Sequence, residues 1–94
     1  MHVISRKRLK EFATTHTDAE RSLDAWYRIA KAAEWKSIVD VRCAFPHADF
    51  VDPYTIFNVK GNTYRLIVKI EYLRQQIFIK TLLTHAEYDK DNWK

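Results

Sequence analysis

The sequence has very little glycine, proline or cysteine. Its 94 residues include one glycine, two prolines and one cysteine. One glycine cannot build the glycine-rich loop with which many nucleotide-binding proteins hold phosphates. A single thiol cannot form an internal disulfide and has no cysteine neighbour with which to bind zinc. These absences exclude a loop-rich disulfide scaffold, a cysteine-based zinc site and a phosphate loop.

Long apolar segments are also missing. No apolar run approaches the roughly 20 residues that a bilayer-spanning helix needs. The start of the chain has a short basic stretch, Arg6 to Arg8, but no apolar region behind it of the kind that a secretory signal contains. We therefore expect no association with a membrane and a cytoplasmic location.

Apolar and aromatic residues are nevertheless plentiful. Hydrophobic residues make up 47% of the chain and aromatic residues 14%, which is too much apolar surface for a disordered segment. A chain this short has room for one core, so we expect residues 1–94 to form a single domain. The net charge of +4 favours a polyanionic partner.

The first half of the sequence predicts helices. The β-branched residues 3–4 can start a strand, and Ser5 can act as the N-cap of a short helix. Residues 17–20 (TDAE) have the form of a capping box and predict a second, amphipathic helix that ends near Lys36. Residues 37–53 contain turn-like Pro and Asp pairs and are interpreted mainly as a connecting segment.

The second half predicts strands, so the expected fold class is α+β. Gly61 marks a hairpin turn, and residues 85–94 are expected to form a short helical turn with a frayed end. Alternating apolar residues predict three antiparallel strands, at 54–59, 63–73 and 76–84.

The expected register of the last two strands places several polar residues together. If Leu73 pairs with Gln76 in a tight hairpin, apolar residues face apolar residues on one side of the sheet, with Leu66 opposite Leu83. On the other side the pairing puts Arg65 opposite Thr84 and Lys69 opposite Lys80. Two lysines that face each other repel unless an anion or solvent lies between them.

His85 follows the last strand directly, and Tyr88 lies one helical turn further on. These two residues and Arg65 are therefore expected at one end of the sheet, where they form a plausible phosphate site. Cutting RNA without a metal requires proton transfer and stabilisation of a charged phosphorane. Histidine can act as acid or base, a guanidinium can bind phosphate oxygens in pairs, and Tyr88 can orient or stack on a base. Taken singly, each is more often a solvated surface residue.

Three segments carry a resemblance to a known family. They are residues 1–5 (MHVIS), 57–67 (FNVKGNTYRLI) and 84–89 (THAEYD), and in their order and spacing they resemble the HigB toxins. These toxins belong to the RelE-like superfamily of type II toxin–antitoxin systems. The resemblance implies two helices packed on a twisted, mainly antiparallel sheet, and cleavage of mRNA in the ribosomal A site.

The resemblance also implies roles for individual residues. Arg65 matches the arginine that binds the scissile phosphate, and His85 with Tyr88 matches the residues that serve proton transfer. Relatives also use lysines as general base, which leaves Lys60, Lys69 and Lys80 as candidates, with Lys80 favoured over Lys60.

Contacts with the RNA are expected from Lys60, Asn62 and Lys69, without a metal or other cofactor. The implied protein partner is a HigA-type helix-turn-helix antitoxin. The alternative that the residues leave open is a non-catalytic basic module that binds nucleic acid or another protein.

Overall fold

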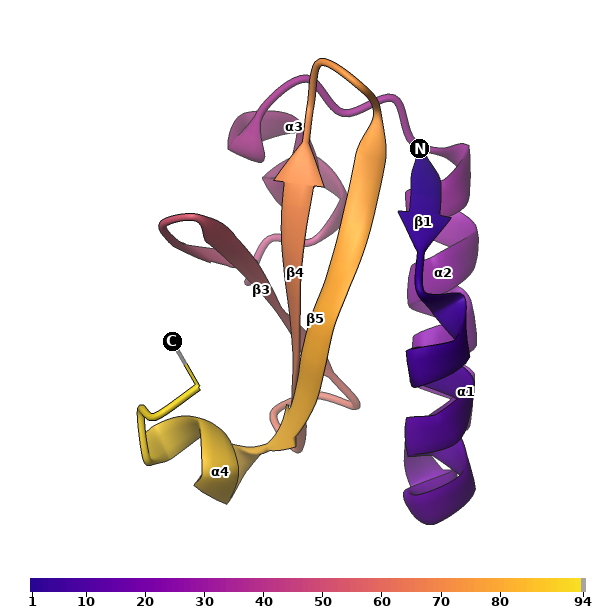
Figure 1. The fold of residues 1–94 in the computed structure, drawn as a ribbon, viewed down its shortest axis with the longest axis vertical. Helices are drawn as coiled ribbons and strands as arrows, with labels where there is room; N and C mark the ends of the chain where they lie inside the picture. The colour runs from indigo at the N-terminus through magenta and orange to yellow at the C-terminus, as the bar shows by residue number, and fades with distance from the viewer. Residues whose placement is uncertain (94) are drawn as a thin grey trace.

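A computed structural model describes residues 1–93 (Figure 1). The chain forms a five-stranded sheet in the order β1-β5-β4-β3-β2. In chain order the elements are β1 (His2–Ile4), α1 (Arg6–Thr15), the 3-10 turn η1 (Thr17–Ala19), α2 (Glu20–Ala32), α3 (Ile38–Ala44), β2 (Asp49–Val51), β3 (Tyr54–Val59), β4 (Tyr64–Glu71), β5 (Gln76–Thr84) and α4 (His85–Asp89).

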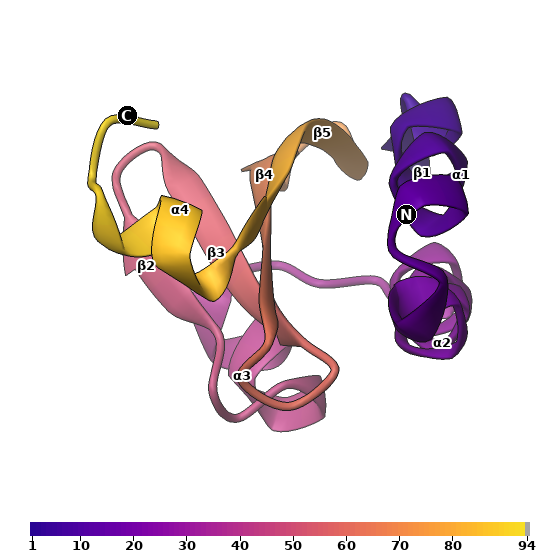
Figure 2. The same ribbon diagram turned by 90° about the horizontal axis from the view of Figure 1, so that it is seen from below.

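The predicted α+β class is confirmed. Helices α1 and α2 lie on one side of the sheet, and α4 lies on the other (Figure 2). Four strands pair antiparallel, whereas β1 pairs parallel with β5. None of the helices between residues 1 and 93 has the length and apolar character that a membrane span requires.

The main core lies between the sheet and the helices. Helix α2 carries Leu23, Trp26 and Ala30 at helical spacing, and all three are buried. The ring of Trp26 meets Phe57 of β3 edge to face at 5.4 Å, an arrangement that adds about 0.5–1.5 kcal/mol to the burial of the two rings. The apolar stripe of α2 therefore fixes the helix layer on the sheet.

The two predicted N-terminal caps are wrong. Ser5 has a left-handed backbone (φ 72°), and its side chain does not cap α1 in the part of the chain that the structure describes. The segment before α2 forms η1 instead of a capping box, because Asp18 is drawn into contacts with Lys60 and Tyr64. Helix α2 also ends at Ala32, four residues before the predicted Lys36.

The segment interpreted as a connection, residues 37–53, contains α3 and β2. Helix α3 has only seven residues, of which Val41 is the one that is buried, so the segment is too short to show a helical period. Strand β2 has three residues and lies at the edge of the sheet. Strand β2 covers the outer edge of β3, and Val41 of α3 packs into the main core.

The predicted register of β4 and β5 is wrong. Glu71 pairs with Gln76, and Lys69 pairs with Phe78 instead of Lys80. The connection is a four-residue loop rather than a tight turn, because the Gln75 side chain donates to the carbonyls of Trp35 and Tyr72 and stabilises the longer path.

An irregularity between Ile67 and Val68 moves the pairing back by one residue, so beyond it the strands are one residue, rather than two, away from the predicted register. Leu66 therefore pairs with Leu82 and not with Leu83, and Arg65 pairs with Leu83 and not with Thr84. Consecutive strand residues point to opposite faces, so Leu82 joins the main core and Leu83 joins the smaller cluster on the other face.

The α4 side of the sheet has a small core of its own. Ile56 and Ile67 are buried there against Trp93, which is only 9% exposed. The predicted frayed end is therefore wrong as far as Trp93, and Lys94 lies outside the described residues. The second core holds the C-terminal segment against the face that carries Arg65.

Candidate active site around Arg65 and His85

Arg65 stands near the start of β4 and is only 8% exposed. Its side chain lies on the α4 side of the sheet, where the guanidinium contacts the ring of Tyr88 at 5.4 Å. Buried charges require partners, and this one has four. Nη1 donates to the carbonyls of Asn62 (3.0 Å) and Tyr64 (3.1 Å), and Nη2 contacts Asn62 Oδ1 (2.6 Å) and His85 Nδ1 (3.1 Å).

Asn62 accepts two hydrogen bonds from this guanidinium. Its backbone oxygen accepts from Nη1 and its side-chain oxygen accepts from Nη2. Nη2 also lies within hydrogen-bond distance of His85 Nδ1. Within residues 1–93 the fifth donor, Nε–H, makes no hydrogen bond. The Nε/Nη2 edge of Arg65 is thus the edge with a donor to spare, and His85 lies beside it.

His85 is held in place by a capped helix. The Thr84 side chain accepts from the Glu87 amide (3.2 Å), and Glu87 accepts from the Thr84 amide (2.9 Å), which together form a capping box. The backbone hydrogen bond to Glu87 is the main reason that the pKa of Glu87 lies below its usual value. The His85 amide also donates to Thr63 at 3.0 Å, which ties α4 to the β3–β4 turn.

The contacts of the His85 ring determine its tautomer. A guanidinium has no acceptor, so Nδ1 of His85 must accept from Arg65. In the neutral imidazole the proton then sits on Nε2, which lies 3.1 Å from Oδ2 of Asp89. Asp89, His85 and Arg65 therefore form a connected row.

Tyr88 lies next to this row, as predicted. Its ring stacks on Trp93 at 5.3 Å and faces the Arg65 guanidinium. The Tyr88 hydroxyl makes no hydrogen bond within the described residues. Trp93 thus fixes the ring, while the hydroxyl group stays free to exchange a proton with a ligand.

The structure separates the lysines from this row and from each other. The Lys80 ammonium lies 4.8 Å from the ring centre of Tyr54, and Lys80 stands three positions along β5 from Leu83, which pairs with Arg65. Lys69 is paired with Glu71 at 3.4 Å. Lys69 and Lys80 are not paired across the strands as predicted. Neither ammonium contacts Arg65 or His85.

Lys60 points to the opposite side of the sheet. It forms a 2.8 Å ion pair with Asp18, which also accepts from the Tyr64 hydroxyl at 2.6 Å. The bonds from Lys60 and Tyr64 lower the pKa of Asp18, and the same contact with Asp18 raises the pKa of Tyr64. Lys60 therefore braces the β3–β4 turn that carries Asn62.

Two contacts of the site were not expected from the sequence. Asn62 was predicted to bind RNA, and the structure shows that its two oxygens also accept hydrogen bonds from the guanidinium of Arg65. Asp89 was not among the predicted site residues, although its position four residues after His85 on a helix is a usable signal. The second capping pattern, at residues 84–87, is equally visible in the sequence. The described residues contain no group of three or more His, Cys, Asp or Glu side chains arranged to hold a metal.

Comparison with known proteins identifies the family of the chain. The HigB toxin family, described as the RelE-like toxic component of a toxin–antitoxin system, matches residues 19–91. The chain belongs to the HigB toxin family. Residues 84–89, which carry His85, Tyr88 and Asp89, fall inside the matched region, as does Arg65.

Individual HigB relatives match nearly the whole chain. An mRNA interferase HigB of Escherichia coli O6:H1 is 31% identical over 96% of this chain and 90% of its own length. The mRNA interferase toxin HigB of Escherichia coli K12 is 29% identical over 95% of this chain and 88% of its own length. The mRNA interferase HigB of Shigella flexneri has the same identity and coverage as the K12 protein. The predicted resemblance of the chain to the HigB toxins is thereby confirmed.

Proposed function

We propose that this protein is a ribosome-dependent endoribonuclease that cuts mRNA by attack of a ribose 2′-hydroxyl on the adjacent phosphate. The observation that supports the proposal best is the contact of Arg65 with His85, a buried guanidinium beside a proton-transfer group. Membership of the toxin family and the mRNA interferase relatives support the same reading.

The binding step uses the Nε/Nη2 edge of Arg65. A phosphate oxygen takes the unused Nε–H, and a second oxygen takes the Nη2–H that His85 accepts in the free protein. Asn62 keeps the other end of the guanidinium in place throughout. The charged donor is thus positioned before the phosphorane forms, which is the condition for strong electrostatic stabilisation.

The same exchange prepares His85. When the Nη2–H of Arg65 binds the phosphate, it no longer donates to Nδ1 of His85. The lone pair of Nδ1 is then available to the reacting group. The ring then accepts the 2′-hydroxyl proton, while Asp89 holds Nε2–H and keeps the ring oriented. The hydroxyl of Tyr88, whose ring lies beside Arg65 and stacks on Trp93, donates the proton that the leaving 5′-oxygen needs. This division of roles requires no metal ion.

The lysines contribute charge rather than proton transfer. Lys80 and Lys69 lie on β5 and β4, away from the Arg65–His85 contact. Their ammonium groups attract phosphates on either side of the scissile one and raise affinity in a salt-dependent way. Lys60 acts indirectly, through its brace to Asp18.

The partners follow from this chemistry. The ribosome aligns the mRNA, and alignment alone accounts for several kcal/mol of a reaction barrier. The toxin family implies an antitoxin, which we propose to be a HigA-type helix-turn-helix protein. Because its proposed substrate and the ribosome are in the cytoplasm, we expect the protein to act there.

The mechanism is tested on a defined mRNA with purified ribosomes. Cutting should occur only when ribosomes are present and should leave a 2′,3′-cyclic phosphate. One 2′-deoxynucleotide at the cut position should abolish cutting there, since the nucleophile is missing. Continued cutting of the deoxy substrate would contradict 2′-hydroxyl attack. Salt-sensitive RNA binding without new ends would favour the non-catalytic module instead.

A further inference from the structure

An open hollow of about 560 Å³ lies beside the Arg65 site. The end of α3, the segment before β2 and the β3–β4 turn surround it. Its volume falls within the range of roughly 300–1,000 Å³ that small-ligand sites occupy. The lining side chains that matter here are His47, Asn58, Asn62, Phe45 and Pro46.

Strand pairing places this hollow next to the guanidinium. Asn58 pairs directly with Arg65 across β3 and β4, so the two side chains share a face of the sheet. The pairing of Asp49 with Ile56 carries the chain just before β2, where His47 stands, towards Asn58. A nucleotide bound at Arg65 therefore has this hollow on its β3 side.

Most of the side-chain hydrogen-bonding groups that line the hollow are unused. Asn62 gives its Oδ1 to the donor-only guanidinium, so its amide has one orientation and its Nδ2 group keeps two free donors. Asn58 and His47 are exposed, and their side chains make no hydrogen bonds among residues 1–93. Three side chains thus offer donors and acceptors to whatever enters.

The lining also excludes several kinds of ligand. No Lys, Arg, Asp or Glu among the described residues lines the hollow, so it offers no ion pair to a phosphate or to a charged peptide. The exposed ring of Pro46 provides an apolar surface. The space beside Gly61 is open, since a Cβ added there would meet no atom within 4 Å. An uncharged, flat ligand with hydrogen-bonding edges fits this combination.

An unpaired RNA base is such a ligand. Proteins recognise single-stranded RNA by contacts with the flat faces of splayed bases and by hydrogen bonds to their edges. An asparagine amide presents a donor and an acceptor side by side, which matches the edge of a base. We propose that the hollow binds the base of the nucleotide next to the phosphate held by Arg65, and so sets the base preference of cutting. This inference rests on the proposed nuclease function.

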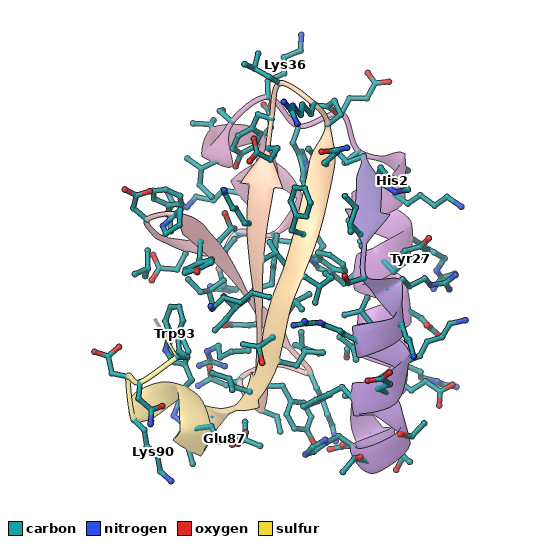
Figure 3. All side chains as sticks on the ribbon, viewed as in Figure 1. His2, Tyr27, Lys36, Glu87, Lys90 and Trp93 are labelled. Atoms are coloured by element: carbon teal, nitrogen blue, oxygen red, sulfur yellow. The ribbon has the colours of Figure 1, made fainter. Side chains whose placement is uncertain are left out.

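Mapping of RNA 5′ ends tests the proposal within the reaction. The wild-type protein should favour one base at a fixed position beside the cut, and Asn58→Ala and His47→Ala should reduce that preference on the order of ten-fold. His2→Ala is the matched control, because His2 is exposed at the opposite end of the molecule from Glu87 and Lys90 (Figure 3). An unchanged preference in both variants, or an equal loss of cutting at every base, would overturn the proposal.

A binding experiment separates this inference from the nuclease function. The probes are the four nucleoside 5′-monophosphates and, as the base-free control, ribose 5-phosphate. We expect the side-chain amide NMR signals of Asn58 and Asn62 to shift with at least one nucleotide but not with ribose 5-phosphate. Equal shifts with all five probes, or none, would exclude a base site. If the protein cuts no RNA, the nuclease proposal fails, and this titration still decides what the hollow binds.

Discussion

The guanidinium of Arg65 donates to Nδ1 of His85 across 3.1 Å, although the two residues are 20 positions apart in the chain. Strand β4 supplies the first group and α4 supplies the second. Neither element can shift without breaking this contact. The candidate site therefore depends on the end of the sheet and the C-terminal helix folding together.

Arg65→Lys should damage both activity and stability. Lysine keeps the charge but cannot bind a phosphate through two parallel N–H groups or reach all four partners of Arg65. Cutting should fall by about 100-fold or more. The free energy of unfolding in urea should drop by about 1–3 kcal/mol, because buried acceptors lose their donor. Arg74→Lys, an exposed arginine in the β4–β5 loop, is the matched control, and wild-type cutting by Arg65→Lys would contradict the role of the guanidinium.

His85 should carry its proton on Nε2 when it is neutral. The donor at Nδ1 and the carboxylate at Nε2 both favour that tautomer. Long-range proton–nitrogen NMR correlations of the imidazole report the tautomer directly. Asp89→Asn should lower cutting only a few-fold, because the contact between His85 and Asp89 is exposed, and even a charged pair at such a position contributes only about 0–1 kcal/mol. A predominantly Nδ1–H ring would show that the Arg65 contact is not formed in solution.

Thr84→Ala should loosen α4. Removal of an N-cap hydroxyl costs about 0.5–2 kcal/mol, and α4 carries His85, Tyr88 and Asp89. We expect a lower free energy of unfolding together with weaker cutting. Thr84→Ser keeps the hydroxyl and should restore most of both. Equal behaviour of the alanine and serine variants would show that the capping hydrogen bond does not matter.

Asp18→Asn should change the pH dependence of stability. The pKa of Asp18 lies below its ordinary value of 3.8, so its ionised form stabilises the folded state above that pH, and the contribution is lost as pH falls through the folded pKa. Tyr64 has a raised pKa, so its contribution is present below pH 10.0 and is lost as pH rises through the folded value.

Urea unfolding at several pH values checks this prediction. The wild-type protein should be more stable than Asp18→Asn near neutral pH, and the difference should disappear in acid. A difference that stays constant down to the lowest pH would assign the effect to packing rather than to charge. Lys60→Met should also be less stable than the wild-type protein near neutral pH, with a difference that disappears in acid, since it removes the ammonium that pairs with Asp18.

The sequence allowed the strands and the cluster of Arg65, His85 and Tyr88 to be predicted, because alternation and chain order determine which residues reach one end of a sheet. It did not reveal the register of β4 and β5. The register depends on the Gln75 contacts in a four-residue loop and on the irregularity beside Val68. Both result from tertiary structure, and neither changes the local pattern of apolar residues.

The helix caps show the same limit. Residues 17–20 and 84–87 both read Thr-x-x-Glu, but only the second forms a capping box. At the first, Asp18 has partners on β4 and in the β3–β4 turn, and these long-range contacts favour a 3-10 turn. A local motif therefore predicts a cap only where no distant partner competes for its residues.

The most direct test of the central claim is the mapping of transcript 5′ ends after a short induction in a bacterium. Cells that express the wild-type chain should stop growing and accumulate new ends within coding regions. Cells that express the Arg65→Ala, His85→Ala double variant at the same level should show neither effect. Full cutting by a folded double variant would contradict the claim that these two groups act together on one phosphate.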